Sequence, residues 1–287
     1  MNRTILFLSD PRAEPTGDNH MTLPVAFRNG NWHVVTASHA LSVRAGDAYA
    51  GEHRLKDFDL VWPLGLGPRE GFLDRMQLLA HSDARLINPP SVYLLLHGKL
   101  AWTDLQPETH AADDWRVLAD VVGQGGEWLL KPAAGSFGRD VTRIRPFDTA
   151  AVRSAMARST DSWFVLQRWE SAIAMGEWRS LLVGDRIIGS YRRTPTDGLR
   201  ANLAAGGHAT RGEPDSRNQA VVDSVRARLR AYGAGFAAID TSGGFLVEVN
   251  VANPGGLGTL NSLHGLSVNS DLVSAIEAWL QRPTRAA

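Results

Sequence analysis

The stretch Ala237-Ala-Ile-Asp240-Thr-Ser-Gly-Gly-Phe-Leu-Val-Glu248-Val-Asn250 holds two apolar runs on either side of a Ser-Gly-Gly turn. This pattern predicts a β-hairpin. Glu248 and Asn250 are two residues apart on a strand, so their side chains leave the same face. Asp240 joins that face only if the loop holds an odd number of residues. A five-residue loop pairs Asp240 with Leu246 and places Glu248 diagonally opposite, at about 7–8 Å.

Two carboxylates and an amide oxygen at this range suit a hard cation that prefers oxygen ligands. Mg²⁺ is the first candidate, because in proteins it keeps some of its water ligands and is also coordinated by substrate phosphates. Mn²⁺ is an alternative. The competing interpretation is an exposed hairpin whose polar face meets water. The pattern alone gives the two interpretations equal weight.

The composition excludes several classes of protein. The 287 residues are enough for one large domain or two to three small ones. Thirty basic and thirty acidic residues give a net charge of zero, which does not favour nucleic acid or an anionic membrane as a partner. No apolar stretch approaches the roughly 18 residues of a membrane span, and the first apolar run reaches Asp10 too soon for a signal peptide. Without cysteine there is no disulfide or thiolate nucleophile, and a cytoplasmic location is expected.

The first ninety residues alternate between strand and helix patterns. Strands are predicted over 4–8, 32–36, 59–63 and 85–88, and a helix over 72–80. Such alternation indicates an α/β domain with a mostly parallel sheet. The strand ends near Asp10 and Pro63 are where an open sheet of this kind binds ligands, although plain connecting loops explain them equally well.

The middle of the chain contains a lysine and a glycine loop. After Pro89-Pro90 comes a helix-like segment, 91–102, whose Lys99 is most simply a solvated side chain. A strand over 128–132 carries Lys131, and a further strand covers 141–144. The loop between these strands contains Gly135, Ser136, Phe137 and Gly138. Its backbone N–H groups could close over phosphates, but two glycines in a hairpin loop more often serve only the turn.

The remaining segments include a group of arginines. A helix is predicted over 147–159, a strand over 163–170 and a hairpin over 176–191 around Gly184-Asp185. Further helices are predicted over 221–232 and 272–280, the last capped by Asn269 or Ser270. The flexible small-residue loop over 202–207 is surrounded by Arg192, Arg193 and Arg200, as expected where a site grips anionic oxygens and then closes. Ordinary solvated arginines on a surface loop are the alternative.

Taken together, these segments resemble the ATP-grasp enzymes and, among them, bacterial glutathione synthetase, over essentially the whole chain. The resemblance is carried by Leu130-Lys131-Pro132-x-x-Gly135-x-x-Gly138, Gln167-x-Trp169, Glu177-x-Arg179, Arg200-Ala-Asn202-Leu-Ala-Ala-Gly-Gly207, Asp240 and Glu248-Val-Asn250-Val-Ala-Asn-Pro254.

The resemblance implies a three-part ATP-grasp fold of mixed α/β class. Its parts are a parallel α/β domain over 1–90, a lid subdomain over 91–170 and an antiparallel-sheet catalytic subdomain over 171–287. It also implies an ATP-dependent carboxylate–amine ligase that forms an acyl phosphate, then an amide. The cofactors would be ATP and two Mg²⁺ ions, the partners an acid and an amine, and the assembly a dimer or tetramer.

Residue roles follow from the same resemblance. The metal ligands would be Asp240, Glu248 and Asn250. The ATP contacts would be Lys99, Lys131, Gly135, Ser136, Phe137, Gly138, Gln167, Arg168 and Trp169. Arg179, Arg200 and Asn202 would stabilise the transferring phosphoryl group and, with Asp10, Asn253, Gly255 and Gly256, would bind substrate.

The sequence departs from the family beside the expected acid pocket. The stretch Trp62-Pro-Leu-Gly-Leu-Gly-Pro68-Arg69 stands where the family has an Arg-Lys-Asp-Pro-Pro type, and Asn253-Pro254-Gly255 replaces Ser-Pro-Thr. The same chemistry on a different acid and amine is therefore an open alternative to glutathione synthesis. A catalytically silent ATP-binding regulator and a small-molecule phosphotransferase are alternatives of other classes.

Overall fold

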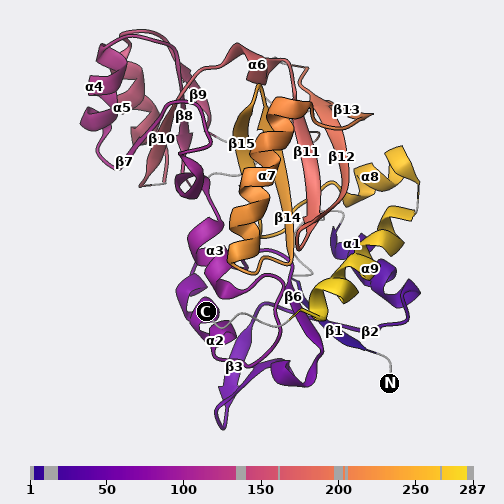
Figure 1. The fold of residues 1–287 in the computed structure, drawn as a ribbon. Coiled ribbons are helices and arrows are strands. Elements are labelled where there is room, and N and C mark those ends of the chain that lie inside the picture. The colour runs from indigo at the N-terminus through magenta and orange to yellow at the C-terminus, as the bar shows by residue number, and fades with distance from the viewer. Residues whose placement is uncertain are drawn as a thin grey trace.

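Four β-sheets organise the described part of the chain (Figure 1). The computed structural model describes residues 3–9, 19–133, 140–160, 162–196, 203, 206–265 and 267–282. Within these ranges no helix is both long enough and apolar enough to cross a membrane. The fold is the mixed α/β arrangement that the sequence predicts, with one parallel sheet followed by two larger antiparallel ones.

The first sheet is parallel, in the order β2-β1-β6. Its strands are β1 (Thr4–Leu8), β2 (His33–Ala37) and β6 (Leu60–Pro63), and β1 and β6 are almost wholly buried, as apolar strands covered on both faces must be. The predicted fourth strand over 85–88 is wrong, because these residues make only a single parallel bridge, Val61 to Leu86. The helix α2 (Phe72–Ala80) is confirmed.

The sequence did not predict α1 (Asn19–Asn29) or a small antiparallel sheet of β3 (Leu41–Arg44), β4 (Asp47–Ala50) and β5 (His53–Arg54), which is followed by the 3₁₀ turn η1 (Leu55–Asp57). Pro24 lies inside α1, where proline normally argues against a helix.

One asparagine joins the amino-terminal segment to the last large sheet. Asn88 is buried, and its Oδ1 accepts hydrogen bonds from the backbone of Gly235 (2.7 Å) and Phe236 (2.9 Å). Its Nδ2 donates to the carbonyls of Phe236 (2.7 Å) and Val251 (2.6 Å). All the ordinary hydrogen-bonding capacity of the amide is thus used to fix one segment against the other.

The middle sheet is antiparallel, with the order β7-β10-β8-β9, and lies in the segment 91–170 that was predicted to be a lid and is called the lid below. Its strands are β7 (Thr109–Ala112), β8 (Trp128–Pro132), β9 (Thr142–Ile144) and β10 (Phe164–Arg168). Two helices, α4 (Trp115–Gly123) and α5 (Thr149–Arg158), cover one face and form a core with side chains such as Trp128 and Leu166 (Figure 1). The other face carries the alternate residues of each strand.

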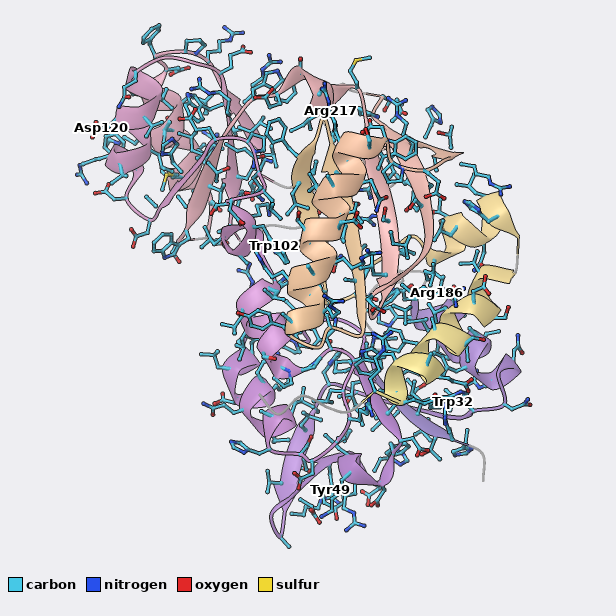
Figure 2. All side chains as sticks on the ribbon, in the orientation of Figure 1. Trp32, Tyr49, Trp102, Asp120, Arg186 and Arg217 are labelled. Atoms are coloured by element: carbon cyan, nitrogen blue, oxygen red, sulfur yellow. The ribbon has the colours of Figure 1, made fainter. Side chains whose placement is uncertain are left out.

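The segment before the lid bends where one helix was expected. It forms α3 (Pro90–Leu96) and a 3₁₀ turn, η2 (Lys99–Trp102), because Gly98 between them has a φ of 93°. Trp102 packs into a shared core with α7 (Ser216–Ala231), beside which Figure 2 shows it. The segment is therefore anchored to the last sheet.

The last sheet has five antiparallel strands in the order β13-β12-β11-β14-β15. They are β11 (Glu177–Val183), β12 (Arg186–Thr194), β13 (His208–Arg211), β14 (Phe236–Ser242) and β15 (Phe245–Asn250), with the short α6 (Ser171–Ala174) leading in from the lid. Helix α7 covers one face, and α8 (Leu257–His264) and α9 (Ser267–Leu280) pack with α1 on the other (Figure 1). The predicted cap of the last helix is wrong, since Asn269 and Ser270 lie inside α9.

Candidate active site

The face of the five-stranded sheet opposite α7 is apolar along one half of its strands and polar along the other half. Because side chains alternate, every second residue of β11 from Glu177 to Val183 reaches this face. Leu181 and Val183 pack with the amino-terminal sheet, α8 and α9 in one core. Glu177 and Arg179 continue the same face beyond that core, where Arg179 pairs with Asp240 of β14. One half of the face is therefore core, and the other half is a buried polar surface.

The hairpin that carries the acidic residues differs from its prediction. Its turn has two residues, Gly243 and Gly244, both with positive φ, and the loop does not hold five. A β-bulge between Asp240 and Thr241 then shifts the register, so that Asp240 pairs directly with Glu248 and not with Leu246. A bulge adds one residue to one strand, which restores the same-face relation that a two-residue turn would have broken.

Four charged residues form a buried cluster on the polar half of the face. Arg179 donates from Nε to Asp240 Oδ1 (2.8 Å) and from Nη2 to Oδ2 (2.6 Å). Arg193 donates from Nη2 to the same Oδ2 (2.7 Å) and also pairs with Glu177. All four residues are less than 10% exposed, so two positive and two negative charges balance where water screens them little.

Burial and the neighbouring charges shift the pKa values of the carboxyl groups in this cluster. Burial opposes ionisation of Asp240, but the two guanidinium groups outweigh burial and hold its pKa below the usual value. Burial raises the pKa of Glu177 to about 6, although Arg193 works against the rise. Asp240 is therefore a fixed negative charge, whereas Glu177 is the member of the cluster that can take up a proton near neutrality.

Arg193 and Glu177 were not among the predicted site residues. A regular hairpin around Gly184-Asp185 would place Arg192 opposite Glu177. A second bulge, between Leu181 and Leu182, moves Arg193 into that position instead. No signal in the sequence marks this bulge, so only the register of the structure could identify the partner of Glu177.

The three predicted metal ligands lie on one face and offer only oxygen donors. The carboxylate of Glu248 accepts no hydrogen bond from any residue that the structure describes. Asn250 Oδ1 accepts from the backbone of Ala252 (3.1 Å) and Asn253 (3.3 Å). Within the same ranges, no three His, Cys, Asp or Glu side chains cluster to hold a metal by themselves. Two carboxylates and an amide are donors that fit Mg²⁺, and a substrate would complete the coordination of such an ion.

The inner face of the lid presents Lys131 to this acidic edge. Lys131 Nζ donates to Gln167 Oε1 (2.7 Å), and both side chains leave the face that α4 and α5 do not cover. Burial lowers the pKa of Lys131 to about 8; Lys99 adds to the fall, while Glu248 and Glu177 oppose it. The mutual influence of these charges indicates that the lid, η2 and β15 border one common space.

His97, at the end of α3, lies within electrostatic range of Lys99 and Glu248. Burial lowers its pKa, and its Nδ1 has no hydrogen-bond partner in the described part of the chain. Nothing in the sequence marks His97 as a site residue, because a lone histidine before Gly98 belongs to no motif.

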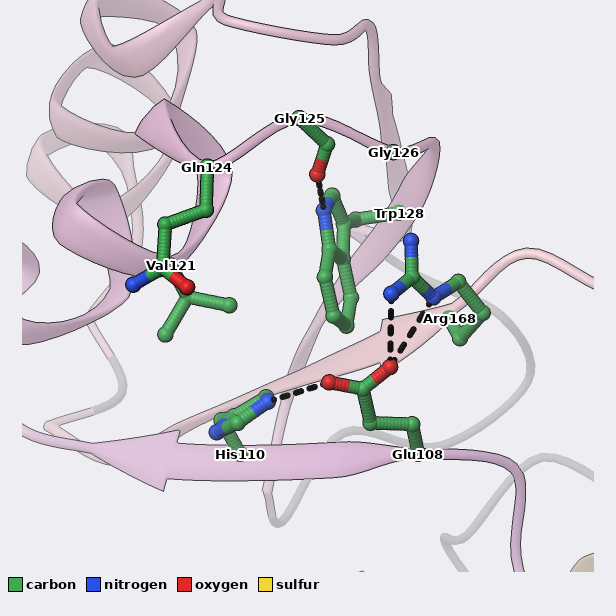
Figure 3. Close-up of a pocket in the computed structure, with 8 residues that line it drawn as sticks. All are labelled: Glu108, His110, Val121, Gln124, Gly125, Gly126, Trp128 and Arg168. Atoms are coloured by element: carbon green, nitrogen blue, oxygen red, sulfur yellow. Dashed lines mark hydrogen bonds and ion pairs between the residues drawn. The ribbon is translucent and has the colours of Figure 1, made fainter.

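Arg168 is the last residue of β10 and Trp169 follows it, and their side chains have different partners. Arg168 leaves the helix-covered face, where it donates to Glu108 from Nε (3.0 Å) and Nη2 (2.7 Å) and lies over the ring of Trp128 at 4.3 Å. There it lines an outer pocket of about 260 Å³ (Figure 3). The structure thus brings Gln167 to Lys131 but not the side chain of Arg168. Trp169 stacks with the guanidinium of Arg143 at 4.4 Å.

The predicted substrate residues after β15 lie next to the buried cluster. Arg179 donates from Nη1 to the carbonyl of Gly255 (2.9 Å). Gly256 has a φ of 114°, and a Cβ there would stand 2.3 Å from the hydroxyl of Tyr191, so only glycine fits. The remaining predicted site residues lie outside the described ranges: Asp10, Gly135, Ser136, Phe137, Gly138, Arg200 and Asn202.

Sequence comparisons point to one family. The family profile described as "prokaryotic glutathione synthetase, ATP-grasp domain" matches residues 97–265. The glutathione synthetase of Gloeobacter violaceus is 30% identical over 253 residues, which cover 83% of this chain and 76% of that protein. That of Thermosynechococcus vestitus is 30% identical over 185 residues, which cover 63% of this chain and 57% of that protein. The chain thus spans about half to three quarters of these two relatives.

Solved structures share the fold at lower identity. D-cycloserine synthetase DcsG superposes with a TM-score of 0.74 at 16% identity, over 97% of this chain and 100% of that chain. The ATP-grasp ligase PsnB, complexed with a minimal precursor, Mg and ADP, gives a TM-score of 0.68 at 12% identity, over 97% and 98%. At these identities the likeness concerns the fold, which is the predicted one.

Proposed function

The chain belongs to the prokaryotic glutathione synthetase family of ATP-grasp ligases, and from this we propose that it joins an acid to an amine at the expense of ATP. One carboxylate oxygen of the acid attacks the γ-phosphorus, the bond to the β-phosphate oxygen breaks, and ADP leaves. The amine nitrogen then attacks the carbonyl carbon of the acyl phosphate and loses a proton, and inorganic phosphate leaves.

The main support for this proposal is that lysines from the lid side and carboxylates from the last sheet border one common space. Phosphoryl transfer requires mainly positioning and charge neutralisation. Lys131, with Lys99, would contact the phosphates of ATP from the lid side, and Gln167 would orient Lys131. Asp240, Glu248 and Asn250 would hold Mg²⁺, which supplies positive charge to the phosphate oxygens.

The buried cluster has a separate role in the proposal. Asp240 fixes Arg179 and Arg193 in place before substrate arrives, so that stabilising developing negative charge requires little rearrangement of either guanidinium. Arg179 also donates to the Gly255 carbonyl, which ties residues 253–256, called the substrate loop, to the same cluster. Arg200 and Asn202 are proposed to complete this group.

The acid and the amine are the less constrained part of the proposal. The named relatives are glutathione synthetases, which makes γ-glutamylcysteine and glycine the first pair to test. The apolar stretch from Trp62 favours a different acid as second candidate: Leu64 is buried in the core, and Gly65 donates to the Ala252 carbonyl beside the substrate loop. We also propose a cytoplasmic dimer or tetramer, from family membership alone.

The test is phosphate release from ATP and Mg²⁺, measured with each substrate alone and with the pair together. Release that requires γ-glutamylcysteine and glycine together, and that disappears in a Lys131→Met variant, supports glutathione synthesis. Release that requires another acid and amine from a panel supports the second candidate. ATP binding without turnover across the whole panel contradicts the ligase proposal, and a stable phosphorylated acid formed without any amine-dependent product would indicate a phosphotransferase.

A further inference from the structure

A polar network, buried at Ser9 and Asn19 and half-buried at His20 and Asn253, lies where three distant segments meet. Ser9 follows β1, Asn19 and His20 begin α1, and Asn253 follows β15. We call these four residues the seam network. Ser9 Oγ lies 2.7 Å from His20 Nδ1, and Asn253 Nδ2 lies 3.4 Å from His20 Nε2. Asn19 donates from Nδ2 to Asn253 Oδ1 (2.8 Å) and to the Pro254 carbonyl (2.8 Å).

The directions of these hydrogen bonds fix the state of the histidine. A backbone carbonyl can only accept, so the Asn19 atom that contacts Pro254 must be its nitrogen. That nitrogen also contacts Asn253, which must therefore present its oxygen to Asn19 and its nitrogen to His20. An amide nitrogen only donates, so Nε2 of His20 carries no hydrogen. The ring proton is then on Nδ1, which donates to Ser9.

The surroundings reinforce this arrangement. Asn19 is fully buried, so the protein leaves no accessible surface through which water could replace a lost partner at its side chain. Burial lowers the pKa of His20, which favours the neutral ring that the hydrogen bonds require.

We infer that His20 is a positioning residue for the ligase reaction, acting in its neutral Nδ1–H tautomer through Asn253. This inference rests on the proposed function. His20 orients the Asn253 side chain, and Asn253 leads directly into Pro254 and Gly255. The Gly255 carbonyl receives Arg179, and Arg179 holds Asp240. The amino-terminal segment is thereby connected to the charged cluster through one loop, and His20 itself contacts no reacting atom.

Two substitutions separate the contacts of the ring. In His20→Gln, the Oε1 atom can occupy the position of Nε2 and accept from Asn253. In His20→Asn, the shorter amide can reach Ser9 but not Asn253. We therefore expect His20→Gln to keep kcat for acid- and amine-dependent phosphate release within about threefold of wild type. We expect His20→Asn to lower kcat about tenfold, which corresponds to one lost neutral hydrogen bond.

Nucleotide affinity and the melting temperature are measured on the same variants, with His33→Asn on β2 as the matched control. Both quantities should remain at the wild-type value, because the hydrogen bonds of the seam network join none of its described residues to Lys131 or to the middle sheet. The inference is overturned if His20→Asn keeps full kcat. It is also overturned if kcat, nucleotide affinity and melting temperature all fall together in both variants. That result is expected of a residue that only stabilises the fold.

A spectroscopic measurement tests the network without any substrate. In long-range ¹H–¹⁵N correlation spectra of the whole protein labelled at histidine, the two nitrogens of a neutral ring have distinct shifts, and the His20 signals are assigned by their loss in His20→Asn. We expect the Nδ1–H tautomer at pH 7.5. An Nε2–H tautomer or a protonated ring overturns the inference, even if the ligase activity is established. Conversely, absence of amine-dependent turnover in the wild type contradicts the proposed function. The spectrum then still tests whether the hydrogen bonds of the seam network hold His20 in the Nδ1–H tautomer.

Discussion

Asp240 and Glu248 stand directly opposite each other on neighbouring strands, yet they have different surroundings. Both oxygens of Asp240 receive guanidinium groups, and its side chain is almost completely buried. Glu248 is partly exposed, and no residue in the described part of the chain donates a hydrogen bond to it. The Asp240 carboxylate therefore holds the buried arginines in addition to its proposed role as a metal ligand, whereas the Glu248 carboxylate has only the proposed metal role.

Replacing Glu248 by Gln should lower activity without lowering stability. The change removes the negative charge that would bind Mg²⁺ while keeping the size of the side chain, so we expect kcat to fall about a hundredfold or more. The Mg²⁺ concentration needed for half-maximal rate should rise. The midpoint of urea unfolding should remain at its wild-type value, and a clear drop in that midpoint would contradict the role assigned to Glu248.

Asp240→Asn should lower the stability of the protein as well as its activity. The substitution leaves Arg179 and Arg193 buried with Glu177 as their remaining carboxylate in the cluster. Removing one partner of a buried ion pair costs about 3–5 kcal/mol of unfolding free energy. Urea unfolding monitored by tryptophan fluorescence measures this cost. A variant as stable as wild type would show that the cluster contributes nothing to folding.

Lys131 should make nucleotide binding depend on pH. Its pKa is lowered to about 8, so the protein without nucleotide loses this positive charge as the pH rises through that value. The protonated amine is the form that attracts phosphate, so affinity for ADP should weaken about tenfold between pH 7 and pH 9.5. Calorimetric titration measures the affinity. Lys131→Arg stays charged over this range and should give a flatter profile, and equal slopes would contradict the prediction.

At the scale of elements, β7 and β13 were missed, because each holds only polar residues and alanine. The other strands of both larger sheets could be predicted from their apolar runs, with ends within a few residues. The registers could not. Two β-bulges, in the β11–β12 and β14–β15 pairs, decide which charged residues meet, and neither has a sequence signature. Helix α1 was missed because Pro24 interrupts its pattern. The short β3–β5 sheet was missed because its strands hold few apolar residues.

The tight turn of the acidic hairpin should tolerate no side chain at Gly243. This residue has a φ of 62°, and a Cβ there would stand 2.6 Å from the Cβ of Ala172 in α6. Gly243→Ala should therefore lower the unfolding free energy by about 2 kcal/mol or more, from backbone strain and the clash together. Gly255→Ala is the control, because nothing lies within 4 Å of its Cβ position. Equal stability of the two variants, measured by urea unfolding, would contradict this account of the turn.

At the scale of the whole molecule, the hydrophobic cores do not follow chain order. One core joins β1 and β6 of the amino-terminal sheet to β11 and β14 of the last sheet, with Trp62 and Phe236 in contact at 5.2 Å between ring centroids. The lid has a core of its own. Sequence patterns identify apolar faces but not their partners, so this pairing of the two ends of the chain could not be predicted from periodicity.

Phe236→Ala should weaken both ends of the chain together. The truncation removes a buried ring shared by two sheets, at a cost of about 3–5 kcal/mol. Amide hydrogen exchange followed by mass spectrometry should show faster exchange in β1, β6 and β14, with β8 and β10 of the lid unchanged. Leu166→Ala in the lid core should give the reverse pattern. Equal loss of protection in the lid for both variants would mean that the cores unfold as one unit.

The asparagine that joins the two ends also affects how the protein ages. Deamidation begins when the backbone nitrogen of the next residue attacks the side-chain carbonyl and closes an imide ring, and that nitrogen must carry a hydrogen. Asn88 is followed by Pro89 and Asn253 by Pro254, and proline has no such hydrogen. Asn29 is followed by Gly30, at the end of α1. Storage should therefore produce acidic charge variants at Asn29 while the two asparagines that connect the segments keep their amides.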